Sequence, residues 1–329
     1  MTRRLLQRLG SGDDRGYGGI WVALVVLFAA SAAVAPGTLR PAPLSGMLPL
    51  AGILVVASIG QTLVVRQRGF DLSLPATMTL CGLVVAATAR DGLPFPVSAV
   101  LALVIALVVG TANGLIVVHL SITPLIATLA TNAVLLGVVW TLSDGLPVAA
   151  PEGLATFVRS DLVGVPTVFA AAVLVVVVAG LVERRSVVGR SFVVAGSSPA
   201  TARAAGIPVP AHVVGAYVVS ALCAGLAGVL LTGFAGTVTP TLGDSYLLPV
   251  VAAVVVGGTP LTGGRGSLVA TAAAALFLTQ LGQVTLALGA PTSSQLLVQS
   301  LSIVLAVVLR SVRRRVRTGR VGEPVPAAG

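Results

Sequence analysis

Three of the few charged side chains in this sequence lie close together, at positions 66 to 71. The stretch VVRQRGFDLSLPAT, residues 64–77, places Arg66, Arg68 and Asp71 between two long apolar runs. Charged groups at such a point need water if the runs cross a membrane, and paired partners if the runs form a soluble core. The surrounding elements decide which of these applies.

The other reactive residue types do not combine into a catalytic site. The chain contains no lysine, so it lacks the lysine of a phosphate-binding loop and is not expected to hydrolyse ATP itself. His119 and His212 are isolated and are not spaced like metal ligands. Cys81 and Cys223 lie inside apolar runs, as small core residues do. We expect no enzyme activity, no metal and no cofactor.

The composition identifies the apolar runs as membrane spans. Of the 329 residues, 56% are hydrophobic and only 9% are charged, and the mean hydropathy is +1.04. A soluble domain carries about 25% charged residues, so this chain cannot cover itself with a polar surface. The net charge of +10 does not indicate nucleic-acid binding, because the arginines cluster between the apolar runs and at the two ends. The predicted fold is an all-α polytopic membrane helical bundle.

The transmembrane domain is predicted over residues 20–309, between a cytoplasmic leader at 1–19 and a basic cytoplasmic tail at 310–329. The first span is read as an uncleaved helix, because further spans follow it. Ten apolar segments are long enough, or nearly long enough, to cross a bilayer. They are residues 20–36, 45–65, 72–89, 96–118, 122–142, 166–182, 213–236, 246–258, 267–288 and 295–309. The eighth is too short for an upright helix, so it is either a shallow crossing or part of a broken helix.

The distribution of arginine predicts the orientation. With ten crossings and a cytoplasmic N-terminus, 17 of the 20 arginines fall on the inner side, and only Arg40, Arg90 and Arg159 fall outside. Both termini are then cytoplasmic, and Arg66 and Arg68 are inner-face charges at the end of the second segment. Omitting the eighth segment would move the arginines of the tail to the outside, which favours counting it.

Asp71 precedes the third apolar segment by one residue, at a predicted boundary. One interpretation is an acid that caps the helix N-terminus and interacts with its dipole. The other is a residue at a helix break that pairs with arginine and shapes the inner mouth of a pathway. We expect a structural or gating role. The glycines of GGTPLTGGRG, residues 257–266, lack the strand-then-helix context of a phosphate site and predict a tight re-entrant turn with close helix approach. They include Gly257, Gly258, Gly263 and Gly264.

Polar residues inside the predicted spans are candidates for lining a translocation pathway, because polar groups avoid lipid. The candidates are Gln61, Asn113, Thr128, Thr131, Asn132 and Gln280. For each of them the alternative is a hydrogen bond between helices that holds the bundle together.

Two loops outside the membrane are long enough to contain structure. The outer loop is residues 143–165 and the inner loop is residues 183–212. In the inner loop, SSPATARAAG predicts a short helix with Ser198 as its cap, Pro199 at its first position and Gly206 at its end. A helix this short is unstable alone, so we expect it to dock against the bundle or a cytoplasmic partner.

Several motifs, in order, resemble the permease subunits of bacterial ABC sugar importers of the ribose type, within the superfamily that includes branched-chain amino-acid permeases. They are GFDLS at 69–73, NG at 113–114, PLIATLAT at 124–131, GRSFVVAGSSPATARAAGIPV at 189–209 and AAVVVGGTPLTGGRG at 252–266. The Asp-Leu-Ser signature, Asp71 to Ser73, favours the sugar branch. The resemblance covers about residues 45–309.

The resemblance implies the partners: a second permease subunit, the same chain or a homologue, two cytoplasmic ATPase subunits that bind the ATP, and an extracytoplasmic solute-binding protein. It also implies a multi-pass location in the bacterial inner membrane, surrounded by lipid, with no nucleic-acid partner. The inner loop would be the element that couples to the ATPase. Its candidate residues are Ser198, Pro199, Ala202, Arg203, Gly206 and Ile207.

The sequence departs from the family pattern in several places. Arg68 stands where the family commonly has glycine, Leu74-Pro75 where it has Val-Gly, and Ser198-Pro199-Ala200 where it has Asn followed by acids. Leu247 and Pro249 replace acids that the family carries near the outer mouth. These departures leave open the identity of the solute and the choice between a homodimer and a heterodimer.

The predicted function is an ABC permease subunit for a sugar or a similar small polar solute. The alternative from another class is an ion-coupled secondary transporter, which generally needs a membrane-embedded acid. Only Asp71 and Asp244 approach such a position, and both are at predicted boundaries. A third alternative, a scaffold without transport activity, is disfavoured by the polar residues inside the spans.

Overall fold

The computed structural model describes residues 17–291 and, beyond them, residues 293, 297, 300, 301, 304 and 308. Most of the predicted leader, the predicted tail at 310–329 and, apart from single positions, the tenth predicted segment at 295–309 lie outside the described residues.

The described part is helical, which confirms the all-α bundle. Nine of the ten predicted segments coincide with helices. These are α2 (Gly18–Val34), α3 (Pro41–Arg66), α4 (Leu74–Arg90), α5 (Phe95–His119), α6 (Pro124–Ser143), α8 (Thr167–Arg185), α11 (Val209–Ala235), α12 (Leu247–Val256) and α13 (Leu268–Ala287). Six of them, α3, α5, α6, α8, α11 and α13, are long and apolar enough to cross a membrane. The 17-residue α2 and α4 and the 10-residue α12 are shorter.

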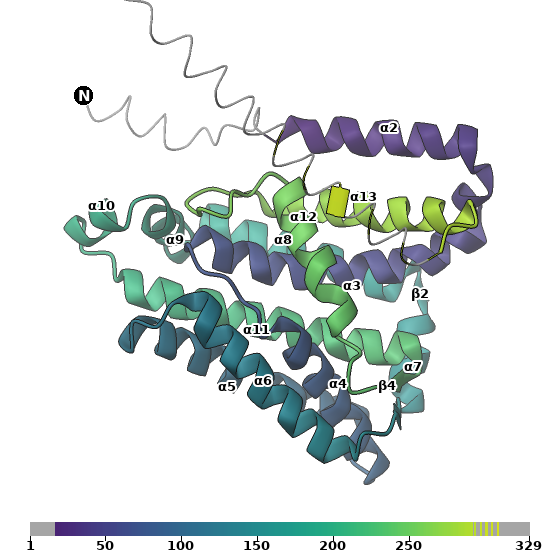
Figure 1. Ribbon diagram of the computed structural model, residues 1–329, viewed down its shortest axis with the longest axis horizontal. Helices are drawn as coiled ribbons and strands as arrows, with labels where there is room; N and C mark the ends of the chain where they lie inside the picture. The colour runs from purple at the N-terminus through teal and green to yellow at the C-terminus, as the bar shows by residue number, and fades with distance from the viewer. Residues whose placement is uncertain are drawn as a thin grey trace, which may run out of the picture.

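Helix α11 is the centre of the bundle, where it packs against α3, α4 and α5 (Figure 1). Residues 74–86 of α4 are all buried. The helices α5, α6 and α8 instead expose rows of leucine and valine, as helices facing lipid do.

The two ends of the bundle differ in structure. One end carries α9 (Val187–Ser197) and α10 (Pro199–Ala204). The opposite end carries α7 (Glu152–Arg159), the antiparallel pair β1 (Val148–Ala149) and β4 (Thr237–Val238), and the hairpin β2 (Asp161–Leu162) and β3 (Val165–Pro166) (Figure 1). Two 3-10 turns complete the structure, η2 (Pro36–Leu39) and η3 (Asp244–Tyr246).

Glycine permits the closest helix contacts in the bundle. A Cβ at Gly110 of α5 would lie 2.6 Å from the Tyr217 carbonyl oxygen of α11, and a Cβ at Gly114 would lie 2.8 Å from the Cα of Val214. Gly228 of α11 is equally tight against the backbone of Met78 in α4. Small residues that let backbones approach replace the hydrophobic effect as the basis of helix association in lipid.

The eighth predicted segment coincides with α12, a short helix within a longer passage along the bundle. The chain leaves the β1–β4 end at Val238 and reaches the opposite end by Gly264, whose amide donates to the Arg66 carbonyl at 2.9 Å. Helix α12 supplies only about 15 Å of that path at 1.5 Å per residue. The preceding backbone is buried against α4, where Gly243 N–H donates to Thr79 Oγ1 at 2.9 Å. A short helix joined to buried irregular backbone agrees with the broken-helix alternative for this segment.

Candidate functional site

Asp71 lies inside the bundle, in a non-helical turn at residues 67–73 between α3 and α4. Its side chain is 1% exposed, and its bonded partner Ser220 lies near the middle of α11. The prediction that Asp71 pairs with the neighbouring arginines at a boundary is therefore wrong. The carboxylate also does not cap α4, whose N-cap residue is Ser73.

The Asp71 carboxylate lies within a chain of hydrogen bonds that connects three helices, α5, α6 and α11. Its Oδ1 accepts from Ser73 N–H at 3.0 Å and Ser73 Oγ at 2.6 Å, and its Oδ2 accepts from Ser220 Oγ at 2.9 Å. Ser73 Oγ accepts from Asn113 Nδ2 at 2.8 Å, and Asn113 Oδ1 accepts from Thr131 Oγ1 at 2.6 Å. A buried carboxylate with three donors is stabilised in place. We call these five residues the polar cluster.

Helix α6 supplies further bonds to the same turn and to the start of α4. Thr128 Oγ1 accepts from Leu72 N–H at 3.0 Å and donates to the Phe70 carbonyl at 3.3 Å. Asn132 Oδ1 accepts from Ala76 N–H at 3.2 Å, in the first turn of α4. These side chains satisfy backbone groups that a helix break would otherwise leave unpaired.

Gln61 differs from the other candidates because it has no bonded partner among the described residues. The side chain is 1% exposed, and neither Nε2 nor Oε1 makes a hydrogen bond. Ser58 Oγ, on the same face of α3, and Thr259 Oγ1, just after α12, are also buried without partners. That face continues to Val65, whose carbonyl borders Gly263. This face of α3 therefore lies toward the glycine-rich residues that follow α12.

Gln280 of α13 belongs to the opposite part of the bundle. Its Nε2 donates to Ser31 Oγ at 3.1 Å and Thr38 Oγ1 at 3.4 Å, which ties α13 to α2 and η2. This placement fits the interhelical alternative for this residue.

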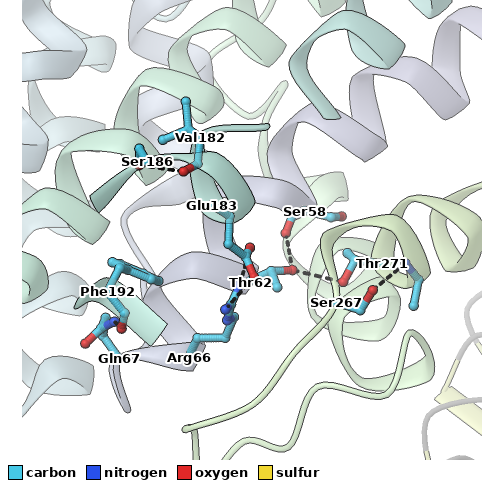
Figure 2. Close-up of polar contacts among 11 residues, drawn as sticks. Ser58, Thr62, Arg66, Gln67, Val182, Glu183, Ser186, Phe192, Ser267 and Thr271 are labelled. Atoms are coloured by element: carbon cyan, nitrogen blue, oxygen red, sulfur yellow. Dashed lines mark hydrogen bonds and ion pairs between the residues drawn. The ribbon is translucent and has the colours of Figure 1, made fainter. Parts of the chain in front are cut away.

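Arg66 is a buried, paired charge and not a solvated one at a membrane surface. Its guanidinium binds Glu183, at the end of α8, through two bonds of 2.7 and 3.0 Å (Figure 2). It also lies 5.6 Å from the ring centroid of Phe192. The next residue, Gln67, donates from Nε2 to the Phe192 carbonyl at 2.8 Å (Figure 2). The end of α3 is thus fastened to both α8 and α9.

Arg68 makes the second connection between α3 and α9. Its Nε donates to the Gly196 carbonyl at 3.2 Å and its Nη2 to the Ser197 carbonyl at 3.1 Å. We call the region where α3 ends against α8, α9 and the glycine turn the inner joint. It comprises Arg66, Gln67, Arg68, Glu183, Phe192, Gly196, Ser197, Gly263 and Gly264.

The predicted glycine turn is present between α12 and α13. Gly258, Gly263 and Gly264 have φ of 92°, 79° and 82°, the left-handed region that glycine adopts without strain. Gly257 instead permits close packing, because a Cβ there would lie 2.7 Å from the Cα of Thr271. Beside this contact Thr62 of α3 donates to Thr271 Oγ1 at 3.1 Å (Figure 2).

The short helix predicted in the inner loop is α10. The Ser198 side chain accepts from the helix N-terminus, Pro199 occupies the first turn, and Gly206 follows at φ 73°. Ala202 is fully buried, and Ile207 packs beside it against α9 and the start of α11. The helix is therefore docked on its own bundle.

The outward face of α10 remains available for a further contact. Arg203, Ala204 and Ala205 are exposed.

Among the described residues no group of three or more His, Cys, Asp or Glu side chains could hold a metal ion. Cys81 and Cys223 are free and buried, as expected.

Sequence reasoning missed Ser220, Tyr217 and Glu183, which complete the site. Ser220 and Tyr217 lie within a long apolar segment, and Tyr217 Oη donates to the Phe70 carbonyl at 3.4 Å. A polar residue at mid-span in α11 was an available signal for Ser220. Glu183 is 117 residues from Arg66, and no local pattern links them.

Comparison with known proteins places the chain among transport permeases. Residues 44–307 match the family described as branched-chain amino acid transport system / permease component. The chain is 32% identical to the probable ABC transporter permease protein y4mJ of Sinorhizobium fredii, over 87% of this chain and 86% of that protein. It is 32% identical to the ribose import permease protein RbsC of Bacillus subtilis, over 88% and 91%.

A third relative is the autoinducer 2 import system permease protein LsrD of Escherichia coli, which is 28% identical over 78% of this chain and 80% of that protein. No solved structure matches the chain.

Proposed function

The chain belongs to the family of branched-chain amino acid transport system permease components, and from this premise we propose that it forms the pathway of an importer for a sugar-like, uncharged polar solute. It is the permease subunit of an ABC importer and a multi-pass protein of the bacterial inner membrane. The match over residues 44–307, most of the bundle, is the observation that carries this proposal.

The solute class is supported by the groups that the bundle leaves unpaired. The Gln61 amide and the Ser58 and Thr259 hydroxyls are buried hydrogen-bonding groups without charge. They suit hydroxyl groups of a solute, which both donate and accept. The two buried charges of the described residues, Arg66 and Asp71, already have partners within the protein, so neither is free to bind the carboxylate or the ammonium group of an amino acid. The ribose and autoinducer 2 permeases among the relatives agree with this class.

Gln61 is the strongest candidate for lining the pathway. A buried amide with no partner costs roughly 1–3 kcal/mol, so a state of the transport cycle in which it meets water or solute offsets that cost. Asn113, Thr128 and Thr131 instead bind the 67–73 turn or the cluster attached to it, and Asn132 binds the first turn of α4. We assign all four to holding this turn and α4 in place.

The proposed arrangement has ten crossings with both termini in the cytoplasm. The bias of arginine toward one side supports it, and so does the passage of residues 239–263 from one end of the bundle to the other. The end with α9 and α10 is then the inner one, and the end with α7 is the outer one.

The proposed partners follow from the family. Two cytoplasmic ATPase subunits bind and hydrolyse the ATP, a second permease subunit completes the pathway, and a solute-binding protein docks on the outer end. We assign contact with the ATPase to α10, because its capped, docked backbone presents an exposed face that includes Arg203. This chain then needs no nucleotide site of its own.

The solute is identified most directly on the solute-binding protein of this importer. A thermal-shift panel of sugars, polyols and amino acids should raise the melting temperature of that protein with a hydroxyl-rich, uncharged compound. The same compound should be imported by cells that express the complete system. Stabilisation and import of a branched-chain amino acid would contradict the proposed solute class.

A further inference from the structure

Arg68 has a backbone conformation that its residue type disfavours. Its φ is 66°, in the left-handed region that glycine adopts without strain and a side chain with a Cβ does not. Among the described residues, Ser121, Asp144 and Val163 share a positive φ, and like Arg68 they are exposed. Of these four, only Arg68 donates side-chain hydrogen bonds to a distant segment. The side chain therefore performs a task that glycine could not.

That task is to hold the C-terminal end of α9. The carbonyls of Gly196 and Ser197, which accept from Arg68, belong to the last residues of the helix and carry its negative partial charge. Gly196 itself is close to α3, since a Cβ there would lie 2.5 Å from the Arg66 carbonyl oxygen. Only Ser198 separates these carbonyls from α10. Arg68 therefore binds the chain immediately before the helix proposed to contact the ATPase.

Arg68 is itself part of the 67–73 turn, and the residues that follow it pack into the bundle. Gly69 lies against the Tyr217 side chain, where a Cβ would be 2.6 Å from Oη. The Phe70 carbonyl accepts from Tyr217 and from Thr128, and Asp71 then enters the polar cluster. The turn is fixed at its far end by α5, α6 and α11. The turn therefore connects the end of α9, through Arg68, to the start of α4.

We propose that Arg68 is a positioning residue through which movement of α10 reaches the polar cluster and the start of helix α4. The proposal rests on the assignment of α10 as the contact with the ATPase. Because the guanidinium binds two carbonyls at once, a single ammonium group replaces it only in part.

The experiment uses the complete importer in proteoliposomes and measures solute molecules imported per ATP hydrolysed, together with the melting temperature. The decisive variant is Arg68→Gly, because glycine favours the observed φ while removing both bonds to α9. We expect an unchanged or higher melting temperature, continued ATP hydrolysis, and a coupling ratio lower by about tenfold. Arg68→Lys should fall between this variant and the wild type.

A matched control is Arg265→Ala, which removes an exposed arginine from the glycine turn; it should leave the coupling ratio unchanged. A wild-type ratio in Arg68→Gly would overturn the proposal, and so would a loss of transport that parallels a lower melting temperature.

Arg203→Glu, on the exposed face of α10, distinguishes a failure of the role of Arg68 from a failure of the assignment of α10 to the ATPase contact. If it uncouples transport and Arg68→Gly does not, only the role of Arg68 is wrong. If neither variant changes the ratio, the assignment of α10 to the ATPase contact fails as well.

Discussion

At the scale of single residues, the notable charge is Asp71, a carboxylate buried in a bundle of apolar helices. Its three donors come from Ser73 and Ser220, and no basic side chain in the described part of the chain is bonded to it. Each oxygen of the carboxylate accepts a hydrogen bond from the protein itself. This arrangement suits a residue that holds the 67–73 turn in place better than one that carries protons. Asp71 therefore keeps the gating or structural role proposed for it, with different partners.

Substitution of Asp71 separates hydrogen bonding from charge. Asp71→Asn should keep most transport, since its carbonyl oxygen can accept from Ser73 while its amide donates to the Ser220 hydroxyl. Asp71→Leu leaves buried donors unpaired at roughly 1–3 kcal/mol each, and should lower the melting temperature and abolish transport. Uptake at matched membrane abundance and melting in detergent provide the comparison. If the Asn variant folds normally but does not transport, and wild-type uptake depends on pH, the ion-coupled alternative regains support.

Gln61 and Asn113 should respond in opposite ways to loss of polarity. Gln61→Leu removes an unpartnered amide, so the melting temperature should stay the same or rise while uptake falls. Asn113→Leu breaks bonds to Ser73 and Thr131, so the melting temperature should fall. Both variants are compared with the wild type in the same detergent. A Gln61→Leu protein with normal uptake would remove this residue from the pathway.

At the scale of elements, glycine determines how closely α5 and α11 approach. Gly110→Ala would place a Cβ 2.6 Å from a backbone oxygen, so the helices must separate, at a cost of about 1–3 kcal/mol. Gly137 of α6 is the matched control, because a Cβ there meets nothing within 4 Å. Gly137→Ala should be neutral or stabilising by about 0.5–1 kcal/mol. Thermal unfolding of both variants tests this packing, and equal melting temperatures would refute it.

The elements that the sequence predicted well are those with strong local signals. Apolar runs defined α3, α5, α6, α8, α11 and α13 to within a few residues. A serine cap, a proline and a closing glycine defined α10. Helices α7 and α9 were missed, because each is short, lies in a loop with polar residues and depends on burial against the bundle.

At the scale of the whole molecule, the contacts that build the site connect residues far apart in the chain. Arg66 finds Glu183, Asp71 finds Ser220 and Gly264 finds the end of α3. The sequence shows which of these residues are unusual in a membrane span. It does not show their partners, because pairing depends on which helices lie next to each other in the bundle. Only the hydrogen bonds in the structure separate the predicted pathway residues into two groups. Gln61 has no bonded partner in the part of the chain that the structure describes and stays a pathway candidate, whereas Asn113 is bonded and holds helices together.

The architecture as a whole fits a subunit that moves in response to another protein. Helix α4, which follows the 67–73 turn, and residues 239–246, which precede α12, meet where Gly243 N–H donates to Thr79 Oγ1. Arg68 binds the 67–73 turn to the end of α9, and the glycine turn that follows α12 binds the end of α3 through Gly264. Both paths therefore lead to the end of the bundle that carries α9.

The central claim is that this chain transports only when a separate ATPase hydrolyses ATP. The direct measurement is solute uptake into proteoliposomes that contain the permease, its ATPase and its binding protein, with ATP supplied on the ATPase side. We predict uptake that requires hydrolysis, that disappears when the catalytic base of the ATPase is substituted, and that persists when ionophores dissipate ion gradients. Uptake by the permease alone, driven by a proton or sodium gradient, would contradict the account.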